Sequence, residues 1–471
     1  MKNALLAALA ALACAQTARQ GPASGVTANS LKADVSFLAS DALEGRGTPS
    51  RGLDIAAEYV AAQFRRAGLE PGGDDGYFQT AAFEEVKPNV EGMEVTFDVG
   101  GSKLRVDPKS MDLRQAAAAD LDNVPVLRVK ANELASLGAG QAHGKALLLE
   151  AARPPPAAND LEAALVILLV NSAPRGAPAR PALREAAAPA PTPVVTVRDR
   201  AVRAALGAAK AAAVKVSAHI PPPIMRPLQL RNVIGILRGS GASLEDACLV
   251  LSAHYDHLGV GTNVKGDRIF NGANDDASGT ASVIEIAGTL SALPARPQRS
   301  IVFAAFFGEE TGELGSLYYV QHPVFPLART IADVNLEQLG RTDDSEGPKV
   351  LQFNLTGFDY TTMAPVFQAA ARETGVRAVN DEEYGDSYFG RSDNARFADA
   401  GVPATTVSVA YMFPDYHAVG DEWPKLDYAN MAQVDSAIAL AVFRLADSAD
   451  APQWNKDNPT TARYQEARDR R

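Results

Sequence analysis

The sequence predicts an α/β fold, a mixed and mostly parallel sheet flanked by helices, with a smaller β-rich domain inserted into it. Two observations predict this class. From Leu228 onward, short apolar runs alternate with stretches whose apolar residues recur at helical spacing, which is typical of a sheet covered by helices on both faces. Residues 110–227, in contrast, are rich in Ala and Pro and carry short apolar runs between Pro-rich turns.

Composition indicates how many domains the chain can form and argues against one class of partner. The chain has 471 residues, of which 46% are hydrophobic and 21% charged, so it is long enough for more than one globular domain. Its formal net charge of -11 argues against a nucleic-acid partner, because proteins that bind nucleic acid normally carry a basic face.

The first residues predict export. Residues 1–15 carry Lys2 and then an apolar stretch that is too short to span a bilayer, as in a secretory or lipoprotein signal. Ala11-Leu12-Ala13 before Cys14 fits a signal-peptidase site and loosely resembles a lipobox, from which Leu12 departs. We therefore expect a periplasmic or extracellular protein, attached to a membrane only if Cys14 is lipidated. Cys248 lies in an apolar run and predicts a buried thiol, not a disulfide.

The larger domain is expected to comprise residues 28–109 and 228–449. It begins with two amphipathic helices, the second of which ends at Gly68. Residues 450–471 are expected to form a polar tail that frays. Further strands are predicted at 232–237, 247–253, 300–307, 330–336, 349–355 and 403–410, and further helices at 277–293, after Glu313, at 361–373 and at 428–445.

The inserted domain is expected over residues 110–227. Its apolar runs at 145–149, 165–170 and 193–197 predict strands, and Pro-rich segments separate them. The pattern of these runs is similar to the protease-associated domain that is inserted in several peptidase families. A linker-rich α+β subdomain is the alternative.

Side chains that bind metals follow four of the predicted strands. Ligands of open α/β sheets bind at the carboxyl ends of strands, so these positions predict one shared site. Imidazoles and carboxylates suit zinc, with cobalt or manganese as alternatives. The residues concerned are His254 and Asp256 after the second strand, Asp275 in the next loop, Glu309 and Glu310, Glu337, and His417 in a later loop.

Each of these residues also has an ordinary structural interpretation. His254 alone would more often be a structural histidine, and Asp275 would more often cap a helix. Glu309 and Glu310 could form a solvated turn, and Glu337 could lie on the surface. The recurrence of these residue types at strand ends, together with two of only six histidines, favours a site.

The motifs together resemble a known family. HYDHLG, NGANDDASGTA, FFGEETGELGS, NLEQLGR, SDNARFADAGVP and DYHAVGDEW are similar, in this order, to the co-catalytic di-zinc peptidases of metallopeptidase family 28, which include bacterial leucyl aminopeptidases and glutamate carboxypeptidase II. The resemblance covers most of residues 28–447, including the stretch LASDALEGRGTPSRG. It implies the zinc exopeptidase fold and two zinc ions per chain.

The resemblance also implies roles for the residues. Asp275 would bridge both ions. His254 and Glu337 would complete one site, and Glu310 and His417 the other. Asp256 would orient His254. A cis peptide bond is implied between Asp275 and Asp276. Glu337 departs from the family pattern, which usually has Asp at this position, and this leaves the affinity and metal preference of that site open.

The implied reaction is peptide hydrolysis by a metal-bridging hydroxide, with Glu309 as general base. Tyr388 is the first candidate for a hydroxyl that supports the oxyanion, and Tyr416 the second. An aminopeptidase acting on peptides is the expected activity. A carboxypeptidase of the same family, with Arg391 or Arg341 binding the substrate carboxylate, a glutaminyl-cyclase-like acyltransferase and a non-catalytic ectodomain remain alternatives. Side-chain preference and oligomeric state are not readable from the sequence.

Overall fold

The structure, a computed structural model, describes residues 25–471 except 139, 152–157, 159–160, 171–181, 210–213, 265 and 382. The expected signal at residues 1–15, with Cys14, lies outside the described residues. The chain divides into two compact units, one of residues 1–81 and 230–471 and one of residues 82–229, which are described separately below. Within the described part of the chain, no helix is long and apolar enough to cross a bilayer.

A mixed sheet forms the centre of the first unit, with its strands in the order β21-β20-β22-β17-β13-β16-β12-β2. The central strands β22, β17, β13 and β16 are mutually parallel, and β12 and β20 run antiparallel to their neighbours. The strands are β2 (Phe78–Lys87), β12 (Ile224–Leu237), β13 (Cys248–His254), β16 (Ser300–Phe306), β17 (Thr330–Leu336), β20 (Gln352–Leu355), β21 (Arg377–Val379) and β22 (Ala404–Ser408). This arrangement confirms the predicted fold class.

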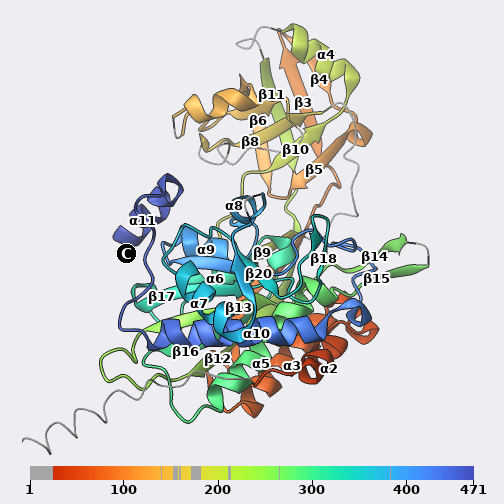
Figure 1. Cartoon of the computed structure of the whole chain (residues 1–471). Helices are drawn as coiled ribbons and strands as arrows, with labels where there is room; N and C mark the ends of the chain where they lie inside the picture. The colour runs from red at the N-terminus through yellow and green to blue at the C-terminus, as the bar shows by residue number, and fades with distance from the viewer. Residues whose placement is uncertain are drawn as a thin grey trace, which may run out of the picture. The chain divides into compact units, whose positions relative to one another are not determined.

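Helices cover both faces of this sheet (Figure 1). On one face, α10 contacts α2, α5 and α7, and α3 contacts α5. On the other face, α6 and α11 both contact α9. The helices are α2 (Ala28–Leu38), α3 (Arg51–Arg66), α5 (Gly279–Ser291), α6 (Leu314–Gln321), α7 (Ala364–Thr374), α8 (Gly385–Tyr388), α9 (Asn394–Asp399), α10 (Tyr428–Asp447) and α11 (Ala462–Asp469). Because both faces are covered, β13 and β16 are buried along their whole length, as expected of central parallel strands.

Local signals explain where the first helices begin. The side chains of Thr27 and Ser50 accept hydrogen bonds from the backbone N–H groups of Ser30 and Leu53, and so cap α2 and α3. Short strand pairs complete the first unit, namely β1 (Glu70–Pro71) on β12, β14 (Gly259–Val264) with β15 (Asp267–Phe270), and β18 (Asp343–Asp344) with β19 (Gly347–Pro348). Cys248 is fully buried, as predicted.

The second unit contains a sheet in the order β4-β3-β11-β6-β7-β8-β10-β5, and α4 (Arg200–Ala208) lies beside it. Three apolar runs predicted as strands are β7, β8 and β10, and these lie side by side and parallel. The strands are β3 (Glu94–Val99), β4 (Ser102–Arg105), β5 (Met111–Gln115), β6 (Ala119–Val129), β7 (Ala146–Leu149), β8 (Leu165–Leu169), β10 (Val194–Val197) and β11 (Val214–Ile220), and β9 (Ala182–Glu185) pairs with residues 83–86 of β2.

The first boundary of this unit lies at residue 82, whereas the sequence analysis placed it at residue 110. The reason is strand pairing over a long sequence distance. β3 pairs with β11, so that residues 94–99 form one sheet with residues 214–219. Local apolar patterns carry no information about which distant strand a segment pairs with.

The expectation that residues 450–471 form a frayed tail is wrong. These residues fold onto the first unit and form α11. The side chains of Trp454 and Tyr464 are both 2% exposed, and their rings stack with centroids 4.8 Å apart. Burial of two aromatic side chains outweighs the polar composition around them.

Candidate metal centre

The candidate site lies at the carboxyl ends of three adjacent parallel strands. β13 lies between β16 and β17, and His254 at its end is in register with Phe306 at the end of β16. Glu309 and Glu310 follow β16 in a short helical turn, and Glu337 directly follows β17. The parallel alignment therefore brings together side chains that are far apart in the sequence.

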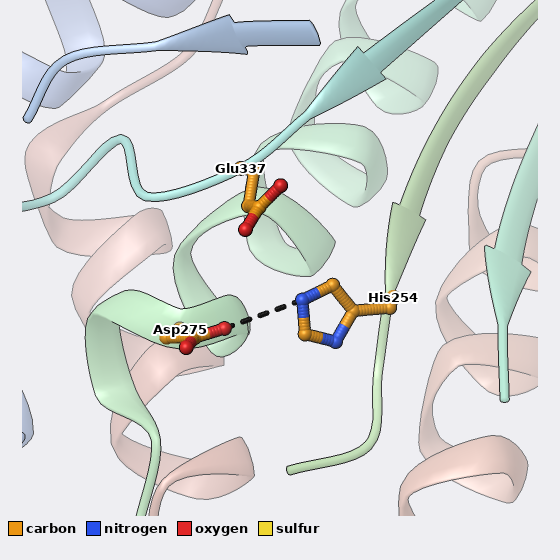
Figure 2. Close-up of side chains that lie close together, drawn as sticks. All are labelled: His254, Asp275 and Glu337. Atoms are coloured by element: carbon orange, nitrogen blue, oxygen red, sulfur yellow. Dashed lines mark ion pairs between the residues drawn. The ribbon is translucent and has the colours of Figure 1, made fainter. Parts of the chain in front are cut away.

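One group of candidate ligands consists of His254, Asp275 and Glu337. Each offers one ligand atom, and these atoms all lie within 4.8 Å of one another. The Nε2 atom of His254 is 3.3 Å from Oδ1 of Asp275. Figure 2 shows the three side chains pointing toward a common space, one from the end of β13, one from the turn before α5 and one from the end of β17.

A second group of candidate ligands shares Asp275 with the first. It consists of His257, Asp275 and Glu310, again with ligand atoms within 4.8 Å of one another. Nδ1 of His257 is 2.8 Å from Oε1 of Glu310. His417 approaches the same carboxylates, since its Nε2 is 3.0 Å from Oδ2 of Asp275 and 3.5 Å from Oε1 of Glu310. The structure thus brings together all five sequence-predicted ligands.

The residues present fit divalent cations such as zinc. The carboxylate of Asp275 belongs to both groups, as required of a residue between two ions. Nε2 of His254 and both ring nitrogens of His257 are buried without a hydrogen bond of normal geometry in the described structure. Buried polar atoms of this kind need an explanation, and a bound ion is one. Imidazole nitrogens with carboxylate oxygens form the donor set that zinc prefers.

The charges at the site also favour a bound cation. Burial would raise the pKa of Asp275, but the nearby imidazoles of His254 and His417 outweigh burial and lower this pKa well below its ordinary value. Burial raises the pKa of Glu309, and the neighbouring Glu337 and Glu310 raise it further. Several carboxylates therefore compete for few positive charges in a partly desolvated space, and such a space favours cations.

Backbone contacts hold Asp275 in place. The peptide bond between Asp275 and Asp276 is cis, as the resemblance implied. The carboxylate of Asp421 accepts hydrogen bonds from the N–H groups of Asn274, at 2.9 and 3.0 Å, and of Asp275, at 3.1 Å. Gly272 has a φ of 60°, and a Cβ atom there would lie 2.4 Å from the His257 ring, so only glycine fits this approach.

Asp256 links the end of β13 to the turn that carries Glu309. Its Oδ1 accepts a hydrogen bond from the backbone N–H of Glu309 at 3.1 Å, and its Oδ2 accepts one from the hydroxyl of Thr48 at 2.8 Å. Nδ1 of His254 is 3.6 Å from Oδ1 of Asp256 and 3.2 Å from the backbone oxygen of Asp256. Asp256 is thus placed to orient both His254 and Glu309.

Two tyrosines were candidates for a hydroxyl that supports the reaction. The hydroxyl of Tyr388 donates to Sδ of Met412 at 2.9 Å. The ring of Tyr416 stacks on His417 with centroids 4.0 Å apart. Burial raises the pKa of Tyr416, and the charges of Asp275, Glu337 and Glu310 raise it further, so the hydroxyl of Tyr416 lies within the field of the ligand carboxylates.

The two arginines proposed to bind a substrate carboxylate differ. Arg341 is 4% exposed and already bound, because its guanidinium donates to Asp343 at 2.7 and 2.6 Å and to Asp415 at 2.9 Å. Arg391 is exposed, and its guanidinium lies over the ring of Tyr388, 4.2 Å from the centroid.

Sequence reasoning missed three residues of this region. His257 stands within the quoted motif HYDHLG, and a second imidazole beyond the same strand was the signal for it. Arg46 is fully buried and donates to the carbonyl groups of Tyr255, Asn271 and Gly272 at 2.8, 2.8 and 2.9 Å. Asp421 lies in the motif DYHAVGDEW. Local sequence does not reveal the contacts of Arg46 and Asp421, which join distant segments.

Comparison with known proteins gives consistent matches. The family model described as "Peptidase family M28" matches residues 232–442. "Aminopeptidase YwaD" of Bacillus subtilis is 26% identical over 232 residues, which are 48% of this chain and 47% of that protein. A "Probable zinc metalloprotease" of Leptosphaeria maculans is 36% identical over 225 residues, 45% of this chain and 48% of that protein. The matches thus span about half the length of each of these two relatives.

Solved structures support the fold. An aminopeptidase from Aneurinibacillus sp. strain AM-1 superposes with a TM-score of 0.55 at 20% identity, covering 91% of this chain and 96% of that one. A zinc aminopeptidase from Bacillus subtilis superposes with a TM-score of 0.51 at 20% identity, covering 90% and 96%. At this level of identity the likeness concerns the fold alone. The family model matches residues 232–442, less than half of the chain, and shows that this part of the chain resembles peptidase family M28.

Proposed function

We propose that the protein is a zinc-dependent exopeptidase that removes N-terminal residues from peptides, using two zinc ions. The observation that carries this proposal is the pair of ligand groups that share Asp275, with Glu309 beside them and in neither group. Relatives named as an aminopeptidase and as probable zinc metalloproteases support it. His254, Asp275 and Glu337 would hold one ion, and Asp275, Glu310 and His417 the other.

Bound zinc would polarise the scissile carbonyl group and lower the pKa of water. Glu309 would take a proton from that water and return it to the departing amine. Its position is suited to this task, because its backbone N–H is fixed on Asp256 and its side chain is only partly buried. A raised pKa, caused first by burial, gives this carboxyl group the proton affinity that a general base needs.

The first experiment uses peptides with free, acetylated and amidated ends, incubated with the purified protein with and without a chelator. We expect cleavage of peptides that have a free amino terminus, loss of cleavage with the chelator and recovery with zinc. Cleavage only of acetylated peptides with a free carboxyl terminus would indicate a carboxypeptidase. Formation of pyroglutamate without hydrolysis would indicate a cyclase.

The second experiment tests the base. Glu309→Gln should lower kcat by about 10²–10⁴-fold, the usual contribution of a general base, and leave the bound zinc unchanged by elemental analysis. Glu313→Gln is the matched control, since Glu313 lies in the same loop but pairs with Arg396 at 2.8 Å. Full activity of a zinc-loaded Glu309→Gln protein would contradict the assignment.

Export, for which residues 1–15 are the only support, is part of the proposal. Expression of the full chain in a bacterial host, followed by N-terminal sequencing of the mature protein, tests it. A new terminus after Ala13 or Ala15, or a lipid on Cys14, is expected, and an intact Met1 on a cytoplasmic protein would contradict it.

A further inference from the structure

A small pocket opens beside the candidate metal centre, within the first unit. Glu337, one of the candidate ligands, forms part of its wall together with Gln338. The remaining wall comes from β22 and the loop after it, the loop after β20 and the segment around α8. Its volume of about 20 Å³ is small, since a cavity needs about 10–15 Å³ to hold one water molecule. A pocket of this size beside the candidate metal centre has room for one small polar group, such as the end of a substrate side chain.

Three polar atoms of the pocket wall are buried without a hydrogen-bond partner in the described structure. They are Oε1 of Gln338, Oγ of Ser408 and the hydroxyl oxygen of Tyr411, from residues that are 3%, 1% and 3% exposed. Burial raises the pKa of Tyr411, so its hydroxyl keeps its proton and can donate it. A buried polar atom without a partner is costly. The two hydroxyl groups can donate and so indicate an occupant that accepts hydrogen bonds, whereas Oε1 of Gln338 only accepts and has no part in that binding.

The pocket also has a cation available to a ligand. Arg391 lines it and stacks on Tyr388, and no ion pair of its guanidinium is found within the described ranges. Tyr388 thus lies against the guanidinium without using its hydrogen-bond donors. The carboxylate in the wall is that of Glu337, whose charge a bound metal ion would offset. The wall therefore offers positive charge with hydroxyl donors.

This donor set matches a carboxylate, which when ionised only accepts hydrogen bonds and pairs with a guanidinium through two parallel bonds. We propose that the pocket binds a carboxylate group of the substrate, held by Arg391, Ser408 and Tyr411. The inference rests on the proposed aminopeptidase function, which makes the side chain of an N-terminal Glu or Asp the expected source. The carboxyl terminus of a peptide is the other source of the same chemistry.

The test compares kcat/KM of the zinc-loaded enzyme for the 4-nitroanilides of L-glutamate, L-glutamine and L-leucine. We expect the glutamate substrate to be preferred. Arg391→Gln should lower its kcat/KM by about 10–100-fold, mainly through KM, and leave the leucine substrate within about threefold, because a charged hydrogen-bonded pair is lost for one substrate only. Arg463→Gln is the control, since Arg463 stacks on Tyr464 at 4.5 Å but does not line the pocket.

Other outcomes separate failure of this inference from failure of the proposed function. Preference for leucine, with an equal effect of Arg391→Gln on all three anilides, would overturn the carboxylate pocket and leave the aminopeptidase intact. Cleavage only of acetylated dipeptides with a free carboxyl terminus, reduced by Arg391→Gln, would overturn the aminopeptidase and support the pocket with the other carboxylate.

If the protein cleaves none of these substrates, a direct binding measurement still tests the inference. Calorimetric titration of the zinc-loaded protein with L-glutamate and L-leucine should show tighter binding of L-glutamate, which Arg391→Gln reduces about tenfold or more and Arg391→Lys reduces less. Equal affinity for the two amino acids would overturn the inference.

Discussion

Nδ1 of His257 lies 2.8 Å from Oε1 of Glu310, although the two residues belong to different strand ends, after β13 and after β16. His257 is fully buried, and its Nε2 atom has no hydrogen-bond partner in the described structure. His417, in contrast, belongs to a loop, and its side chain is 38% exposed. The second ligand group thus contains one imidazole fixed by the sheet and one that approaches from a loop.

This arrangement predicts that His257 contributes to metal binding. His257→Ala should weaken the binding of one of the two zinc ions by about 10–100-fold, the usual cost of removing a group that ligates or orients a ligand. Competition with a chelating dye measures this affinity. His219→Ala is the matched control, since its side chain is exposed in the second unit. Unchanged affinity for both ions in the His257→Ala protein would contradict the prediction.

Arg46 is predicted to stabilise the fold around the metal centre. Its side chain is fully buried, and its guanidinium donates to carbonyl groups from α2, from the end of β13 and from the loop before Asp275. Burial lowers its pKa to about 10, so it stays charged at neutral pH. Arg46→Met leaves these carbonyl groups unpaired and should lower the free energy of unfolding by about 3–5 kcal/mol.

Urea unfolding measures this loss. Arg51→Met is the control, because Arg51 is exposed at the start of α3 and its removal should change stability by less than about 0.5 kcal/mol. Similar midpoints for the two variants would show that the buried contacts of Arg46 add nothing to stability.

The sequence predicted what depends on local patterns. Each strand that carries a candidate ligand was located because its apolar run is continuous, and the ligands followed because parallel strands place their ends at one edge. What it could not predict depends on contacts between distant segments. Arg46 binds the carbonyl group of Tyr255, 209 positions away in the sequence. The pairing of β3 with β11 places the start of the second unit at residue 82 and not at the predicted residue 110. Likewise, the sequence around Trp454 and Tyr464 is polar, so local composition did not predict that these two side chains are buried.

Tyr416 is predicted to matter more for catalysis than Tyr388, which the sequence analysis placed first. The ring of Tyr416 lies against His417, whereas the hydroxyl of Tyr388 already donates to Met412. If the Tyr416 hydroxyl supports the oxyanion, Tyr416→Phe should lower kcat by about 10²–10³-fold, the usual effect of removing one such donor, with little change in KM. Tyr388→Phe should lower kcat by less than about tenfold. Steady-state kinetics on an aminoacyl anilide distinguishes the two variants. A larger loss of kcat in Tyr388→Phe would indicate that Tyr388, and not Tyr416, supports the oxyanion.

Asp34 is predicted to make the stability of the protein depend on pH. Burial raises its pKa from 3.8 to about 7, although a hydrogen bond from Tyr59 opposes the shift. Because the folded-state pKa is raised, the contribution of Asp34 to stability is complete below about pH 4 and is lost as the pH rises through about 7. Asp34→Asn should therefore raise the free energy of unfolding at pH 8 by about 1–3 kcal/mol and flatten its pH profile between these limits. Urea unfolding across this pH range measures the profile. The exposed Asp54→Asn is the control, and parallel profiles for wild type and Asp34→Asn would contradict the prediction.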